Sequence, residues 1–203
     1  MLTNERIRPL SDSVRKGLYP LLLATLLAPL IVYFHECGHY LLALGFGATP
    51  EFHLAKVRVH NLGPLTNQAN FWIAAGGPMV DALLSTTGFL WLCLSRSTRA
   101  GTAPTRADCL GIVLVMSVAN FVVGFVKRFV VHVLPPASGD ASRMSLSMGL
   151  PIWCVPSLLS LFALVLVGAT MCLFPPRHRL VPFGFAFLGW FAGVRILHFW
   201  FSP

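Results

Sequence analysis

Five long apolar runs constrain the fold of this chain more than any other feature of its sequence. A helix needs about 20 apolar residues to cross the hydrocarbon of a bilayer. Inside lipid, backbone polar groups must be satisfied within the segment itself, which favours helices. The expected spans are residues 18–46, 71–94, 110–134, 150–174 and 183–201. The sequence therefore predicts an all-α membrane protein with about five transmembrane helices.

Composition favours a multi-pass membrane protein and argues against a nucleic-acid-binding protein. Of the 203 residues, 56% are hydrophobic and only 11% are charged, which lies outside the range of soluble domains. The net charge is +8, but Lys and Arg fall in short clusters between the apolar runs rather than in one basic stripe. The sequence has no internal repeat and no long linker. We expect a single integral membrane domain over residues 1–203, surrounded by the lipid bilayer.

Residues 51–70, between the first two spans, follow a different pattern. Phe52, Leu54, Val57 and Val59 roughly alternate with polar neighbours before an Asn-Leu-Gly-Pro turn signal. This pattern predicts a short surface β-hairpin between helices one and two. An exposed strand edge can pair with an extended peptide, so these four residues are candidates for substrate binding. A hairpin that only covers a neighbouring site accounts for the pattern equally well.

The pentad His35-Glu36-Cys37-Gly38-His39 lies inside the first apolar run. Ionisable side chains at that depth are costly and are usually functional. Two histidines at i and i+4 share one helix face, so both imidazoles can bind a single zinc ion while the intervening Glu reaches the water beside it. The pentad predicts His35 and His39 as metal ligands, Glu36 as the catalytic base, and one zinc ion as cofactor. The alternative is a His and Glu pair satisfied by neighbours in the helix.

A zinc site of this kind needs a third protein ligand. The residues after His39 lack the Gly and His that continue the motif in one group of soluble zinc proteases. A second group uses a Glu from a following helix, but here the later Glu lies in the expected hairpin. From the residues alone, the candidates for the third ligand are Glu51, His53, His60, Asp81, His132 and Asp140.

Three stretches together resemble the site-2 protease family of intramembrane zinc metalloproteases. HECGH matches the family's HExxH motif, and GGPMVD at 76–81 resembles the Gly-Pro motif that follows its surface hairpin. HVLPPASGD at 132–140 resembles its Asn-x-x-Pro motif ending in Asp-Gly. The resemblance covers roughly residues 20–145, so the last two spans fall outside it. It implies Asp140 as the third zinc ligand, and hydrolysis of a peptide bond in or near a transmembrane segment of a membrane-protein substrate.

Three positions depart from the family pattern. Ala141 replaces the Gly after the aspartate, His132 stands where Asn is usual, and Asp81 stands where Asn is common. His132 is therefore an alternative ligand or a partner of one, and Asp81, Asn120 and His132 are further polar candidates for the site. The departures favour, as an alternative function, a catalytically lapsed zinc-binding membrane protein that binds or escorts a partner. A zinc-binding transporter or channel component is a second alternative, which the lack of a repeat disfavours.

Charged residues give two conflicting indications of orientation. Nine Lys and Arg residues lie in the N-terminal segment and in the loops after the second and fourth spans, against three in the loops of the other side. Those three are Lys56, Arg58 and Arg143. The positive-inside rule thus predicts a cytosolic N-terminus, which places the HECGH end of the first span on the opposite side of the membrane. The family's usual orientation instead places the zinc nearer the cytosol.

Three basic residues lie within the expected spans. Lys127 and Arg128 are expected to snorkel from near a helix end to the interface, and the alternative is that they line a polar path. Arg195 lies deeper in the last span and is expected to pair with Asp81. Because the chain has no second domain that could regulate it, we expect regulatory membrane proteins among its partners.

Overall fold

The structure is a computed structural model that describes residues 8–53, 56–60, 65–135 and 139–201. Within this part of the chain, five helical segments are long and apolar enough to cross a membrane. They are Gly17–Gly45, Asn67–Leu94, Arg106–Val130, Cys154–Cys172 and Pro176–Leu197. The expected all-α architecture, with five such spans and a hairpin between the first two, is confirmed.

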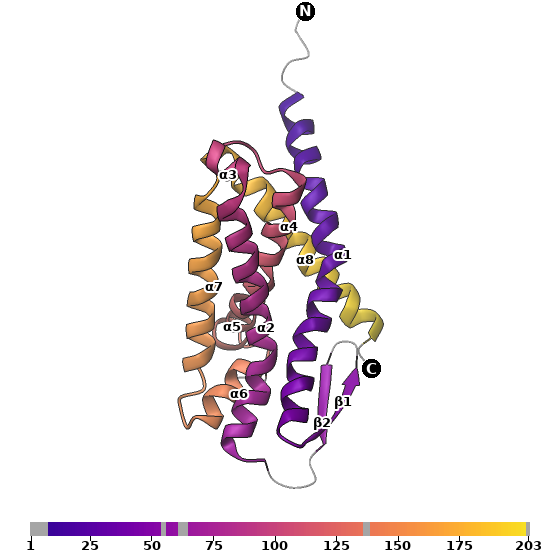
Figure 1. Ribbon diagram of the computed structural model, residues 1–203, viewed down its shortest axis with the longest axis vertical. Helices are drawn as coiled ribbons and strands as arrows, with labels where there is room; N and C mark the ends of the chain where they lie inside the picture. The colour runs from indigo at the N-terminus through magenta and orange to yellow at the C-terminus, as the bar shows by residue number, and fades with distance from the viewer. Residues whose placement is uncertain (1–7, 54–55, 61–64, 136–138, 202–203) are drawn as a thin grey trace, which may run out of the picture.

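The long helices run roughly along one axis, with α8 crossing behind α1 (Figure 1). Three of the spans lie within α1 (Arg8–Gly45), α2 (Asn67–Leu94) and α7 (Cys154–Cys172), and α8 (Leu180–Phe201) contains most of the fifth. α1 and α8 approach closely because two glycines face the α1 backbone. A Cβ at Gly189 would lie 2.1 Å from the carbonyl oxygen of Leu21, and one at Gly193 would lie 2.5 Å from that of Thr25. Small residues of this kind are what allow membrane helices to pack closely.

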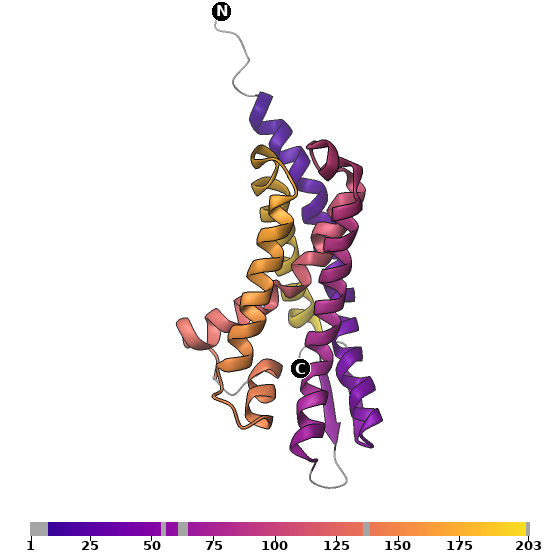
Figure 2. The same ribbon diagram turned by 60° about the vertical axis from the view of Figure 1, so that its left-hand side comes forward.

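The third span is broken, although the sequence predicted one helix over 110–134. It consists of α4 (Arg106–Val115), a 3₁₀ turn η2 (Met116–Val118), α5 (Ala119–Phe125) and a π-helical turn η3 (Val126–Val130). In the 3₁₀ turn, the Ser117 hydroxyl donates a hydrogen bond to the backbone carbonyl of Asp81 at 3.1 Å, which ties the break to α2. Beyond α4 the chain passes across α7 instead of continuing along α4 (Figure 2). The prediction of one continuous helix is therefore wrong.

A short helix, α6 (Asp140–Ser147), lies where the sequence predicted a loop. It follows Gly139, whose φ of 89° is a backbone conformation that favours glycine. The Ser145 hydroxyl accepts a hydrogen bond from the backbone N–H of Val155 at 3.0 Å, which fixes α6 to the start of α7. α6 also packs against α2. Tertiary packing therefore makes this segment helical, and α7 begins at Cys154, later than expected.

The expected antiparallel hairpin is formed by β1 (Thr49–His53) and β2 (Lys56–His60). One face of it packs on α1 through the ring of Phe52. The centroid of this ring lies 5.1 Å from that of Tyr33 and 5.8 Å from that of Tyr40, in edge-on contacts. The hairpin therefore stands beside the helix that carries the pentad.

The opposite end of the bundle is closed by short elements. α3 (Arg96–Ala100) joins α2 to α4, and η4 (Pro176–His178) joins α7 to α8. The buried carboxylate of Asp108 accepts hydrogen bonds from the N–H and the hydroxyl of Thr105, both at 2.7 Å, and from the hydroxyl of Ser97. These hydrogen bonds join α3 to α4, so the buried carboxylate of Asp108 has a structural role.

Most of the apolar core lies toward the end of the bundle that carries α3. It fills the space among α1, α2, α4 and α8 with residues that include Ala28, Leu92, Ile112, Val113, Phe174 and Phe183. The half that carries the hairpin and α6 contains His35, His39 and Asp140, which lie close together.

Candidate metal centre

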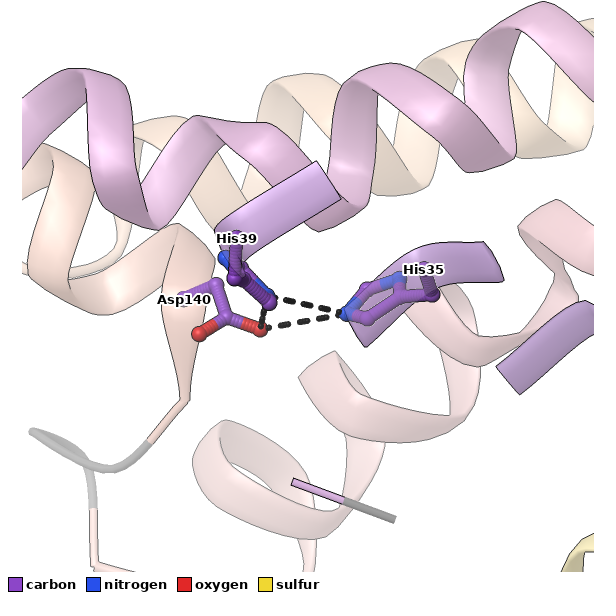
Figure 3. A group of neighbouring side chains, drawn as sticks. All are labelled: His35, His39 and Asp140. Atoms are coloured by element: carbon purple, nitrogen blue, oxygen red, sulfur yellow. Dashed lines mark hydrogen bonds and ion pairs between the residues drawn. The ribbon is translucent and has the colours of Figure 1, made fainter. Parts of the chain in front are cut away.

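Two histidines of the pentad and one aspartate converge at the hairpin end of the bundle (Figure 3). Nε2 of His39 lies 3.2 Å from Nε2 of His35. Oδ2 of Asp140 lies 3.5 Å from Nε2 of His35 and 3.4 Å from Nε2 of His39. Each residue thus offers one ligand atom to a common point, and the group could hold a metal ion. The structure brings together the two ligands read from the pentad and the third that the family resemblance implied.

The other ring nitrogen of each histidine has its own acceptor. Nδ1 of His35 lies 2.9 Å from Oδ2 of Asp81, and Nδ1 of His39 lies 2.6 Å from the carbonyl oxygen of Ile73. When Nδ1 donates to these acceptors, the proton is held there and the lone pair of Nε2 is left for a metal. Asp81 is therefore not a ligand in this arrangement, but the partner that orients one.

The Gly-Gly-Pro stretch of α2 makes room for the pentad. A Cβ at Gly76 would lie 2.4 Å from the carbonyl oxygen of Gly38, and a Cβ at Gly77 would lie 2.3 Å from Nε2 of His35. The first glycine lets the backbones of α1 and α2 touch, and the second leaves space for the imidazole. Pro78 does not interrupt the helix, which runs without a break from Asn67.

Asp140 reaches the histidines because it is the first residue of α6, directly after Gly139 with its positive φ. Its side chain is 31% exposed and its carboxylate lies at a helix N-terminus, where negative charge is favoured. Burial would raise the pKa of Asp140, but hydrogen bonds from His35 and His39 outweigh burial and hold this pKa well below its usual range. The carboxylate is therefore ionised, which is the form that binds metals.

Two cavities meet at the metal centre. The first measures about 380 Å³, lies between the spanning helices, and is lined by residues that include His35, Glu36, Asp81 and Asn120. The second measures about 830 Å³ and lies between β2, the start of α2, and α6. Glu36 and Asp140 line both cavities. A polar molecule in either cavity would therefore meet the Glu between the two histidines.

Glu36 stands beside the ligand group and the hairpin. Its side chain is half-buried, and it lines the second cavity together with Val57 of β2. Val59 lines the second cavity together with Val57. Of the other residues predicted to bind substrate, Phe52 packs on α1, and Leu54 lies outside the described residues.

The basic residues inside the spans lie differently from what the sequence suggested. Lys127 and Arg128 line the first cavity instead of snorkelling away from it. Arg128 packs against the residue before the third ligand, since a Cβ at Gly139 would lie 2.1 Å from its Nη2. Arg195 lies over the ring of Phe191, at 5.3 Å from its centroid, while Asp81 contacts a histidine of α1. The predicted pairing of Arg195 with Asp81 is therefore wrong.

The remaining candidates for the third ligand lie outside the group of ligand atoms. His132 is exposed and has a φ of 54°, just after the π-helical turn. Glu51 contacts His60 at 3.1 Å and His53 at 3.6 Å on the hairpin. The hydrogen bond from His60 lowers the pKa of Glu51. These hairpin side chains therefore contact one another and not the pentad.

Sequence reasoning missed two groups that contact the centre. The carbonyl of Ile73 carries no sequence signal, because any residue there presents the same oxygen. Arg128 did carry a signal, since a charge in an apolar span is usually functional.

Comparison with protein-family models, with curated proteins and with solved structures finds no match to this chain, so its function must be argued from the centre itself.

Proposed function

We propose that this chain is an intramembrane zinc metalloprotease, which hydrolyses a peptide bond in or near a transmembrane segment of a membrane-protein substrate. The observation that carries the proposal is the convergence of His35, His39 and Asp140 within one helical bundle, with Glu36 beside them and lining two cavities. Two imidazoles and one carboxylate form the type of donor set found in catalytic zinc sites, which keep one position open.

The spacing of the three donor atoms fits zinc. Zinc bonds to nitrogen and oxygen are about 2.0–2.1 Å, so donors at tetrahedral angles lie about 3.3 Å apart. The distances among Nε2 of His35, Nε2 of His39 and Oδ2 of Asp140 are 3.2, 3.4 and 3.5 Å. Nδ1 of His35 contacts Asp81, and Nδ1 of His39 contacts the carbonyl of Ile73. Metal-binding imidazoles usually have such an acceptor at the nitrogen that does not bind the metal. The residues present therefore fit the ion.

The departure at Ala141 from the family pattern leaves this fit intact. Ala141 lies inside the first turn of α6, where alanine is a better helix former than glycine. The conformation that needs a glycine occurs one residue before the ligand, at Gly139, and a glycine is present there. The altered motif therefore keeps Asp140 at the start of the helix.

In the proposed reaction, each residue of the centre has a separate task. Zinc, when bound, supplies a Lewis acid that polarises the scissile carbonyl and makes water a better nucleophile near neutral pH. Glu36 takes the proton of the attacking water and passes it to the leaving amine. Asp81 holds the ring of His35 in place throughout. The two cavities give water a route to Glu36 at membrane depth.

The outer edge of β2 offers a binding site for an extended substrate. His53 and Lys56 are the last opposed residues of the hairpin, and a pair in this place is expected to be hydrogen-bonded, with non-hydrogen-bonded pairs alternating along the strands. Val57 and Val59 are therefore expected to direct their backbone N–H and C=O away from β1. One observation agrees with this assignment: the residue opposite Val59 is Pro50, which has no N–H.

The experiment that tests the proposal compares purified full-length wild type with Glu36→Gln and His39→Ala. Bound zinc is measured by elemental analysis, and cleavage is measured on a panel of single-span substrates in detergent and in nanodiscs. The wild type should hold one zinc ion and cleave. Glu36→Gln should keep zinc and lose cleavage, and His39→Ala should lose both. Absence of zinc from the wild type would contradict the proposal.

A zinc-binding protein without catalysis is the second candidate, favoured by the departures at His132 and Ala141 from the family motif. The same measurements separate the two. Wild type that holds zinc and cleaves none of the substrates, but retains one of them in pull-down from membranes, would favour a protein that binds or escorts a partner.

A further inference from the structure

The larger of the two cavities has an uneven charge. Five of its lining side chains are basic or imidazole groups, namely His39 of the metal centre together with Lys56, Arg58, His60 and Arg143. The carboxylates among the described lining residues are Glu36 and Asp140, and both belong to the metal centre. Once Asp140 is engaged by a metal, the wall away from the centre is cationic.

These cations have no acidic partner in the part of the chain that the structure describes. None of the ion pairs found there joins a carboxylate to Lys56, Arg58 or Arg143. Glu51, the carboxylate of the hairpin, contacts His60 and His53 and does not line the cavity. The positive charges of Lys56, Arg58 and Arg143, which line this cavity, are therefore not neutralised by an ion pair with a carboxylate.

The origin of these residues in the sequence makes their convergence informative. Lys56, Arg58 and Arg143 are all the Lys and Arg residues between the first and second spans and between the third and fourth. They come from two segments far apart in the chain, β2 and α6, which both line the cavity. Basic residues that served only to orient the protein in the membrane would have no reason to line one cavity.

We propose that this cavity is a vestibule that selects substrates with acidic side chains beside the scissile segment, an inference that rests on the proposed function. Lys56 and Arg58 are two residues apart on β2, so they project from the same face of the strand. A peptide strand added to the outer edge of β2 places its own alternate side chains opposite them. Acidic residues at positions i and i+2 of the substrate therefore meet Lys56 and Arg58, and Arg143 faces them from α6.

A lipid phosphate is the competing occupant, because it has the same charge. The cavity favours the peptide, since its wall also includes the edge strand and the two carboxylates of the centre, Glu36 and Asp140. A headgroup there would place its phosphate beside those carboxylates. A peptide would place its neutral backbone along β2 and only its acidic side chains among the cations.

The test measures binding and not cleavage. Full-length Glu36→Gln is placed in neutral phosphatidylcholine nanodiscs and mixed with three labelled peptides. The peptides share one apolar segment and differ at two flanking positions, i and i+2, which carry Asp, Asn or Lys. Fluorescence anisotropy should show the Asp peptide binding about tenfold more tightly than the Asn peptide and the Lys peptide binding most weakly. The difference should shrink as salt is raised.

Matched variants assign the preference to the cavity. Lys56→Gln combined with Arg58→Gln and Arg143→Gln should bind the Asp and Asn peptides equally. The control combines Arg96→Gln, Arg99→Gln and Arg177→Gln, three exposed residues at the opposite end of the bundle, and should keep the tenfold preference. Should the triple cavity variant fail to fold, Arg58→Gln alone should reduce the preference about threefold, because its side chain is exposed.

Three results would overturn the vestibule: equal binding of the Asp and Asn peptides by Glu36→Gln, a preference that survives in the cavity variant, or a preference lost equally in the control. An unchanged peptide preference together with lost binding to phosphatidylglycerol vesicles in the cavity variant would assign the site to lipid instead. Failure of the proposed function is seen separately, as wild type that prefers the Asp peptide but cleaves none of the substrates.

Discussion

Oδ2 of Asp81 lies 2.9 Å from Nδ1 of His35, so a carboxylate of α2 holds a histidine of α1 from the side opposite the metal centre. Asp81 is 2% exposed, which makes an ionisable residue at this depth expensive unless it has a partner. Its partner is Nδ1 of His35, in the same imidazole ring as the Nε2 that is proposed to bind the metal. A carboxylate in this position fixes the orientation of the imidazole and makes it a stronger ligand.

Replacing Asp81 should weaken zinc binding without removing a ligand. Asp81→Asn keeps an acceptor oxygen but loses the charge, and we expect about a tenfold loss of affinity, while Asp81→Leu should lose about a hundredfold. Competition with a chromophoric chelator on the purified full-length protein measures both. Ser85→Ala is the matched control, since Ser85 is also buried on α2 but bonds to its own helix, at the carbonyl of Ala82. Wild-type affinity in both Asp81 variants would contradict the orienting role.

The second glycine of the Gly-Gly-Pro stretch should be needed for metal binding. In Gly77→Ala the new Cβ would lie 2.3 Å from Nε2 of His35, which is the ligand atom itself. Overpacking of this kind costs about 1–3 kcal/mol, and about 1.4 kcal/mol corresponds to a factor of ten in affinity. Zinc affinity should therefore fall at least about tenfold in chelator competition.

Two further glycine variants distinguish displacement of His35 from a general loss of stability. Gly76→Ala pushes on the Gly38 backbone instead of the ligand, so it should lower the thermal stability of the protein in detergent more than Gly77→Ala does. Gly184→Ala has no atom within 4 Å of its new Cβ and should change neither stability nor zinc binding. Full zinc occupancy in Gly77→Ala would show that the ring has room to move.

The parts of the fold and site that sequence predicted are those determined by local pattern. Apolar length predicted the spans, and the i, i+4 spacing of His35 and His39 predicted two imidazoles on one helix face. The break at Met116–Val118 was missed because it is fixed by a hydrogen bond from Ser117 to another helix. The helix that begins at Asp140 was missed because its polar, serine-rich sequence is held by contacts with α2 and α7.

The roles of individual polar residues depended on which helix faces meet, and sequence does not contain that information locally. Asp81 remained one of six candidate ligands until the structure placed it at the other nitrogen of His35. Arg128 fitted snorkelling because its position near a helix end was all that sequence offered. The π-helical turn redirects it into the cavity beside Gly139.

The proposed substrate edge of β2 gives a prediction about one backbone N–H. Val59→Pro removes an N–H that points away from β1, so the hairpin keeps its own hydrogen bonds while a bound peptide loses one. One hydrogen bond contributes about 0.5–1.5 kcal/mol, so cleavage efficiency should fall up to about tenfold with unchanged thermal stability. Val59→Thr keeps the N–H and should cleave like wild type. Equal cleavage by Val59→Pro and wild type would exclude pairing at this position.

Gly139 provides a test of how the third ligand is positioned. Gly139→Ala must place a side chain at a φ of 89°, and its Cβ would lie 2.1 Å from Nη2 of Arg128. Backbone strain of this kind costs about 1–3 kcal/mol. Gly149→Ala has comparable strain at a φ of 67°, but no atom lies within 4 Å of its Cβ, and it follows α6 instead of preceding it. Both variants should therefore unfold at lower temperature than wild type.

The two variants should differ in zinc binding, because only Gly139 is bonded to a ligand residue. Relief of strain in Gly139→Ala shifts the first turn of α6, and with it the carboxylate that lies 3.4 Å from Nε2 of His39. Zinc affinity should fall at least about tenfold in Gly139→Ala, since metal geometry tolerates small displacements poorly, and should be unchanged in Gly149→Ala. If both variants lost zinc equally, the loss would follow from general destabilisation. If both kept it, Asp140 would be held by the two histidines rather than by the turn that precedes it.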